Sequence, residues 1–158
     1  MSHALSFSAT EPAAIWAEAA DAAAAIVAGE PDGIANMANV AALIWQAVPG
    51  LNWAGFYFLK SDSELVLGPF QGKVACVRIP VGKGVCGTAV AERRSIVVED
   101  VTKIENHIFC DAESRSELVV PLIRDDEILG VIDLDSPAPG RFDEDDRQCV
   151  ERLGSLSR

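Results

Sequence analysis

Residues 117–134 read ELVVPLIRDDEILGVIDL, and this stretch decides the fold class. Two apolar runs rich in leucine, valine and isoleucine, 117–123 and 127–134, flank the polar turn at 124–126. Runs of this length and composition on either side of a tight polar turn are typical of an antiparallel β-hairpin. We therefore predict two adjacent antiparallel strands here.

The segments around this hairpin place helices at the two ends of the chain and further strands in the middle. Helical spacing and capping residues predict helices over 11–30, over 33–48 and after Asp143. Period-two runs predict strands at 52–59, 64–67, 74–79 and 95–98, and a glycine-rich turn opens a short helix at 82–91. Residues 101–116 form a long polar loop, a candidate lid or site. This order indicates an α/β chain of the α+β type, an antiparallel sheet with helices against it.

Composition narrows the classes of partner. The chain has 158 residues with 24 acidic and 13 basic side chains, a net charge of −11, so we expect neither nucleic acid nor an anionic membrane as a partner. No apolar run reaches the roughly 20 residues of a membrane span, and the N-terminus lacks signal-peptide character. We expect a single domain over 1–158 and a cytoplasmic location.

The four cysteines do not suggest a structural framework. Cys76, Cys86, Cys110 and Cys149 are widely and irregularly spaced, with no Cys-x-x-Cys pair. Cytoplasmic thiols stay reduced unless they are catalytic or sensing, so permanent disulfides are not expected. The spacing also argues against a structural zinc site, and we expect no metal.

Each cysteine allows a chemical and a plain interpretation. Cys110 lies in a polar loop, as a thiolate nucleophile requires, but ordinary loop thiols occur there too. Cys86 lies in a helical first turn, where the macrodipole favours a thiolate, although such cysteines often simply pack. Cys76 lies in a predicted strand, either in the core or facing a pocket, and Cys149 is interpreted as structural.

Carboxylates and aromatic residues form a second candidate group. Asp133 and Asp135 are two apart on a strand, so they share a face and raise each other's pKa unless the strand has emerged into solvent. Glu117 begins the neighbouring strand, and Trp53 and Tyr57 share a face of an earlier one. Aromatic walls beside carboxylates suit a small ligand with a methyl end and a cationic end, although core packing also explains the aromatics.

Seven stretches together give a specific resemblance that covers nearly the whole chain. The sequence resembles the free methionine-(R)-sulfoxide reductases, a family of GAF domains. The matching stretches are 52–57 (NWAGFY), 67–73 (LGPFQGK), 75–80 (ACVRIP), 82–89 (GKGVCGTA), 107–112 (HIFCDA, less Phe109), Ser114 with 116–117, and 130–136 (GVIDLDS).

The resemblance implies a GAF fold with the terminal helices on one face of the sheet, and a specific chemistry. Cys110 would attack the sulfoxide sulfur while an acid, such as a protonated member of the Asp133 and Asp135 pair, protonates the oxygen. Cys76 would convert the sulfenic acid to a disulfide, with Cys86 able to exchange, and thioredoxin would restore the dithiol. Glu117, Asp133 and Asp135 would bind the substrate. No metal or organic cofactor is implied, and a homodimer is consistent with the family.

Two other interpretations stay open at this point, because fold alone does not fix function. A non-enzymatic GAF module would bind a small ligand and sense it, although the sequence offers no linker or output domain. A thiol redox sensor would form the disulfide with peroxide, without acceleration by methionine sulfoxide.

Overall fold

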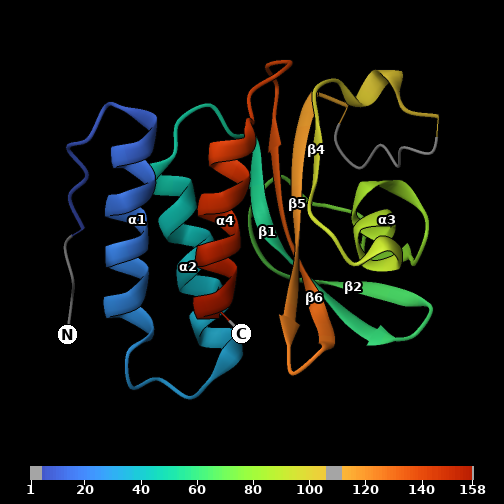
Figure 1. The fold of residues 1–158 in the computed structure, drawn as a ribbon, viewed down its shortest axis with the longest axis horizontal. Helices are drawn as coiled ribbons and strands as arrows, with labels where there is room; N and C mark the ends of the chain where they lie inside the picture. The colour runs from blue at the N-terminus through green and yellow to red at the C-terminus, as the bar shows by residue number, and fades with distance from the viewer. Residues whose placement is uncertain (1–4, 106–111, 158) are drawn as a thin grey trace.

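The computed structural model describes residues 5–105 and 112–157 of the chain. Helices and strands follow one another in the predicted order, with helices at both ends and the strands between them (Figure 1). The elements are α1 (Pro12–Val27), α2 (Gly33–Ala47), β1 (Trp53–Ser61), β2 (Glu64–Gly72), β3 (Arg78–Pro80), α3 (Gly84–Glu92), β4 (Ile96–Val98), the short 3-10 helix η1 (Val101–Lys103), β5 (Ser116–Arg124), β6 (Glu127–Ser136) and α4 (Glu144–Ser157).

The strands form one six-stranded antiparallel sheet in the order β3-β2-β1-β6-β5-β4. The predicted hairpin is β5–β6, and its turn residues Asp125 and Asp126 both have positive φ, at 51° and 66°. Two left-handed residues match the twist of a tight hairpin, and aspartate tolerates that conformation. The predicted α+β class with an antiparallel sheet is confirmed.

The sheet separates two packed layers. Helices α2 and α4 cover one face, α1 packs on these two helices on the same side, and α3 lies against the other face (Figure 1). The residues that point toward the three helices alternate along the strands, among them Phe56, Leu118 and Leu134, all nearly inaccessible to solvent. Because side chains alternate between faces, their neighbours Trp53, Tyr57, Glu117 and Asp133 point toward α3.

Helix α4 begins at a predicted cap and is tied to α1 by a buried contact. The Asp143 carboxylate accepts from the Asp146 backbone N–H at 2.9 Å, and the Asp146 carboxylate accepts from the Asp143 N–H at 2.9 Å. The same Asp146 carboxylate accepts from the indole N–H of Trp16 at 2.7 Å, inside the helical layer. Among the described residues, no helix is long and apolar enough to cross a membrane.

One strand is shorter than the sequence predicts. We expected a strand over 74–79, but β3 pairs only at Arg78–Pro80, and residues 73–77 are a loop that contains Cys76. The reason is that the backbone carbonyl groups of two loop residues accept hydrogen bonds from side chains rather than from a neighbouring strand. The Lys73 carbonyl accepts from Trp53, and the Cys76 carbonyl accepts from Tyr57. Cys76 is therefore a loop residue, and the expected strand placement was wrong.

Replacing Trp16 with phenylalanine tests the contact between α1 and α4. The substitution keeps an aromatic side chain but leaves the buried Asp146 oxygen without its indole donor, so we expect the free energy of unfolding to fall by about 1.5–3 kcal/mol. Urea denaturation measures it. The matched control is Trp45→Phe on α2, where the side chain is 39% exposed, and this change should cost much less. Equal losses in the two variants would contradict the assignment.

Candidate active site

Three strands bring an aromatic ring and two carboxylates into one row on the face that α3 covers. Trp53 of β1 pairs with Asp135 of β6, and Asp135 pairs in turn with Glu117 of β5. Side chains of directly paired residues lie on the same side of a sheet. The register therefore makes these three side chains direct neighbours on one face.

Asp133 occupies the next position on the same face, opposite a glycine of β1. Its partner in the register is Gly55. A Cβ at Gly55 would collide with the Cβ of Phe70 and would lie 2.8 Å from the ring of Trp53. The glycine is therefore required for the aromatic rings to pack beside this carboxylate.

The aromatic wall has three members, one more than the sequence analysis identified. The ring of Trp53 stacks on Tyr57 at 5.7 Å between centroids and on Phe70 of β2 at 5.2 Å. Phe70 lies in the stretch 67–73 that carries the resemblance, but β2 was expected to end at residue 67. The underestimated strand length hid its contribution. The wall lies next to the carboxylate row, since Trp53 belongs to both.

Burial decides the protonation of Glu117. Its side chain is 5% exposed, and burial, together with the negative charge of Asp135, raises its pKa to about 8. Glu117 is also hydrogen-bonded to Asp133 and Asp135. At neutral pH the glutamic acid therefore holds a proton and can donate it. The resemblance leaves open which carboxylate is the acid, with a member of the aspartate pair as one example.

Cys86 lies in the same cluster, in the first turn of α3. It is a free thiol with 3% exposure, and burial followed by the charges of Asp133 and Glu117 raises its pKa well above the ordinary value. The dipole of α3 favours a thiolate at Cys86, but burial and the neighbouring acids outweigh that effect here. Cys86 is a protonated thiol at neutral pH.

The other cysteines lie in different surroundings. Cys76 is partly exposed, takes part in a disulfide and is linked to the aromatic wall, because its carbonyl accepts from the Tyr57 hydroxyl at 3.1 Å. Cys149 is a free, half-buried thiol on α4, on the opposite side of the sheet, in keeping with a structural role. Cys110 lies outside the described residues.

Among the described side chains, Cys86, Glu117 and Asp133 have ligand atoms within 4.8 Å of one another. A thiolate and two carboxylates form a donor set that zinc accepts. The same three side chains also hydrogen bond among themselves, which satisfies part of their buried polar groups without an ion. This is where a metal could be held if one bound.

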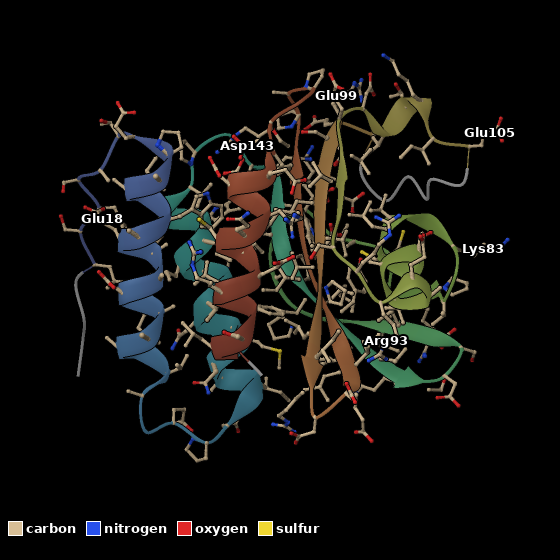
Figure 2. All side chains as sticks on the ribbon, in the orientation of Figure 1. Glu18, Lys83, Arg93, Glu99, Glu105 and Asp143 are labelled. Carbon is tan, nitrogen blue, oxygen red and sulfur yellow. The ribbon has the colours of Figure 1, made fainter. Side chains whose placement is uncertain are left out.

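Helix α3 lies over this cluster as a single short element. Figure 2 shows Lys83 at its start and Arg93 at its end, on the side of the sheet away from Glu18 and Asp143. Arg93 has positive φ, 55°, and ends the helix. The cluster is thus enclosed between the sheet and a helix whose N-terminal turn carries Cys86. Such an arrangement can hold a small polar ligand while excluding most water.

Comparison with known proteins agrees with this geometry. The family model for the GAF domain matches residues 35–157. The chain is 53% identical over 129 residues to the free methionine-R-sulfoxide reductase of Escherichia coli K12, covering 82% of this chain and 78% of that protein. It is 47% identical to the Saccharomyces cerevisiae enzyme of the same name, covering 81% and 75%.

A solved structure extends the likeness to nearly the full chain. The free methionine-R-sulfoxide reductase of Neisseria meningitidis, in complex with its substrate, superimposes with a TM-score of 0.95 at 46% identity, covering 99% of this chain and 93% of that one. The matched regions include the carboxylate row and the aromatic wall. The chain therefore belongs to the free methionine-R-sulfoxide reductase family of GAF domains.

Proposed function

We propose that this protein reduces free L-methionine-(R)-sulfoxide to L-methionine, using its own cysteines as the electron donor and thioredoxin to restore them. The observation that carries the proposal is the row of buried Glu117, half-buried Asp135 and buried Trp53, with Asp133 and Cys86 beside it. Acidic groups and stacked aromatic rings on one face match both ends of the substrate: a cationic ammonium group and an apolar methyl group. Family membership supports the same activity.

The proton for the reaction comes from Glu117 in this proposal. The Cys110 thiolate attacks the sulfoxide sulfur, and the sulfoxide oxygen takes up one proton as it leaves that sulfur and becomes bonded to the Cys110 sulfur. A carboxyl group with a pKa of about 8 is protonated at neutral pH and can supply one. Asp133 and Asp135 provide the negative charge that receives the substrate ammonium group.

The disulfide step follows from the position of Cys76. Attack by Cys110 leaves a sulfenic acid on that residue, and free methionine departs. Cys76 then condenses with the sulfenic acid, which releases water and forms a disulfide. That Cys76 takes part in a disulfide while Cys86 and Cys149 are free thiols supports its role as the resolving cysteine.

Cys86 has a secondary role in this scheme. A protonated, buried thiol is a poor nucleophile, because the thiolate is the attacking species. It lies beside the carboxylates that bind the substrate, so its first contribution is to shape the site. It exchanges with the disulfide only after a movement that exposes it and lowers its pKa.

Turnover with defined epimers tests the activity. Reduced protein with thioredoxin, thioredoxin reductase and NADPH should oxidise NADPH when free L-methionine-(R)-sulfoxide is added, and not with the S epimer or a peptide-bound sulfoxide. Cys110→Ser should abolish turnover, and the matched control Cys149→Ser should keep it within about twofold. EDTA should leave the rate unchanged, because the mechanism uses no metal.

The outcomes of this assay separate the competing functions. Folded, reduced protein that turns over none of the sulfoxides would contradict the proposal and favour a ligand-binding GAF module. Disulfide formation with peroxide, unaffected by methionine sulfoxide, would favour a thiol redox sensor. A loss of activity with EDTA, restored by zinc, would instead assign a metal to Cys86, Glu117 and Asp133.

Glu117→Gln tests the proton donor. The amide cannot donate an acidic proton, so kcat/KM for the sulfoxide should fall by about 10²–10⁴-fold. In the wild-type protein, kcat/KM should decline as pH rises through about 8, because deprotonated Glu117 is inactive. The control is Glu127→Gln, at the exposed start of β6, which should keep the wild-type rate and profile. If kcat/KM of Glu117→Gln still declined in the same way as pH rises through about 8, Glu117 would be excluded as the cause of that decline.

Neutralising the two aspartates tests recognition of the ammonium group. In Asp133→Asn and Asp135→Asn, KM for free methionine sulfoxide should rise by about tenfold or more, because a charge-assisted contact is lost. N-acetylmethionine sulfoxide lacks the positive charge, and it should gain relative to the free amino acid in both variants. If the preference for the free substrate survived in the double variant, the carboxylates would not be its origin.

A further inference from the structure

The loop that contains Cys76 exposes two apolar side chains next to this cysteine. Val74 is 89% exposed and Val77 is 58% exposed, and they lie two residues before and one residue after it. Among the described residues, five large hydrophobic side chains are exposed, these two are among them, and Val74 is the most exposed of the five. Exposed apolar side chains that lie together often mark an interaction site.

The loop is held firmly from beneath. The indole N–H of Trp53 donates to the Lys73 carbonyl at 3.2 Å, and the Tyr57 hydroxyl donates to the Cys76 carbonyl at 3.1 Å. The Leu67 backbone N–H donates to the Val77 carbonyl at 2.9 Å. Trp53 and Tyr57 are themselves buried in the aromatic wall. The two valines are thus presented to solvent by a backbone that is fixed at both ends and in the middle.

We infer that residues 73–77 are the docking surface for the protein dithiol that reduces this enzyme, and that this dithiol attacks the sulfur of Cys76. The inference rests on the proposed function, in which a disulfide at Cys76 must be opened once in every turnover. Attack on a disulfide requires access to one of its sulfur atoms, and Cys76 is partly exposed between the two valines.

The size of the surface favours a transient partner over a second copy of the chain. Two valines and the backbone between them bury little area, whereas permanent dimers bury roughly 2,000 Å² or more. Redox encounters are among the smallest specific interfaces. A dithiol reductant needs only to stay long enough for exchange and must then leave, so a small apolar contact suits it.

The exchange balances as two thiol–disulfide steps. One thiolate of the reductant attacks the Cys76 sulfur, forms a mixed disulfide with it and displaces Cys110 as a thiolate. The second reductant thiol, once deprotonated, attacks its own partner sulfur in the mixed disulfide and releases Cys76, which takes up a proton. The reductant leaves as a disulfide, and the enzyme gains two electrons. Attack on this particular sulfur frees Cys110 directly in the nucleophilic form that the next substrate needs.

The double variant Val74→Ser/Val77→Ser tests the docking surface. With a bacterial thioredoxin, kcat/KM for thioredoxin should fall by about fivefold to tenfold, because apolar contact at the encounter is lost. Turnover of free methionine sulfoxide supported by dithiothreitol should stay within about twofold of wild type, because a small thiol needs no docking surface. The matched control is Ile34→Ser on α2, 64% exposed and remote from the disulfide, which should change neither rate.

The two reductants make the possible failures distinguishable. An unchanged kcat/KM for thioredoxin, or equal losses with both reductants, would overturn the docking surface while the activity itself stands. Absence of turnover with dithiothreitol in the wild-type protein would instead overturn the proposed function.

Trapping the mixed disulfide identifies the attacked sulfur. Oxidised enzyme mixed with a thioredoxin whose second cysteine is replaced by serine should cross-link at Cys76, as located by peptide mass spectrometry. Cross-linking at Cys110 would contradict the inference.

Discussion

The antiparallel register of β1 against β6 is the constraint on which the site depends. It sets Trp53 opposite Asp135 and Gly55 opposite Asp133. The pairing of β6 with β5 then places Glu117 beside Asp135. A slip of one residue would turn the carboxylates toward α1, α2 and α4, where buried charge has no partner. The hydrophobic layer on the helical face therefore fixes the polar face as well, because Ile132 and Leu134 alternate with Asp133 and Asp135 along one strand.

Placing three acids side by side, two of them buried, is unfavourable unless some of the charge is removed. Here the neutral form of Glu117 removes part of it, and the protonated thiol of Cys86 adds none. The same arrangement suits a cationic ligand, which would offset the remaining charge on binding. A site that tolerates its acids by protonation when empty can thus use them for recognition when occupied. The proton on Glu117 thus lowers the cost of holding the acids together, and the same proton is the one that the proposed mechanism donates.

Strand periodicity explains why much of this could be predicted. Residues two or four apart on a strand share a face, so the grouping of Asp133 with Asp135 and of Trp53 with Tyr57 follows from the sequence. The row that joins them depends on β1 pairing with β6, a contact between distant segments that no local pattern encodes. The pKa of Glu117 depends on burial in that row. Cys76 was misplaced because side chains from β1 bind the carbonyls of its loop, which alternation along residues 74–79 cannot reveal.

Cys76 and Cys86 lie in contrasting environments, one open to solvent and the other enclosed. Cys86 is enclosed between α3 and the sheet, where burial and then the neighbouring acids raise its pKa and keep it protonated, and where a protein partner has no access to it. Cys76 lies in a loop that is open to solvent, although its carbonyl is anchored to Tyr57 in the aromatic wall. In the proposed mechanism Cys76 meets both the sulfenic acid and an external reductant, and a position at the rim of the site suits that role. The hydrogen bond from Tyr57 joins that rim to the aromatic wall, so under the proposed function one side chain connects the substrate site with the cysteine that the reductant attacks.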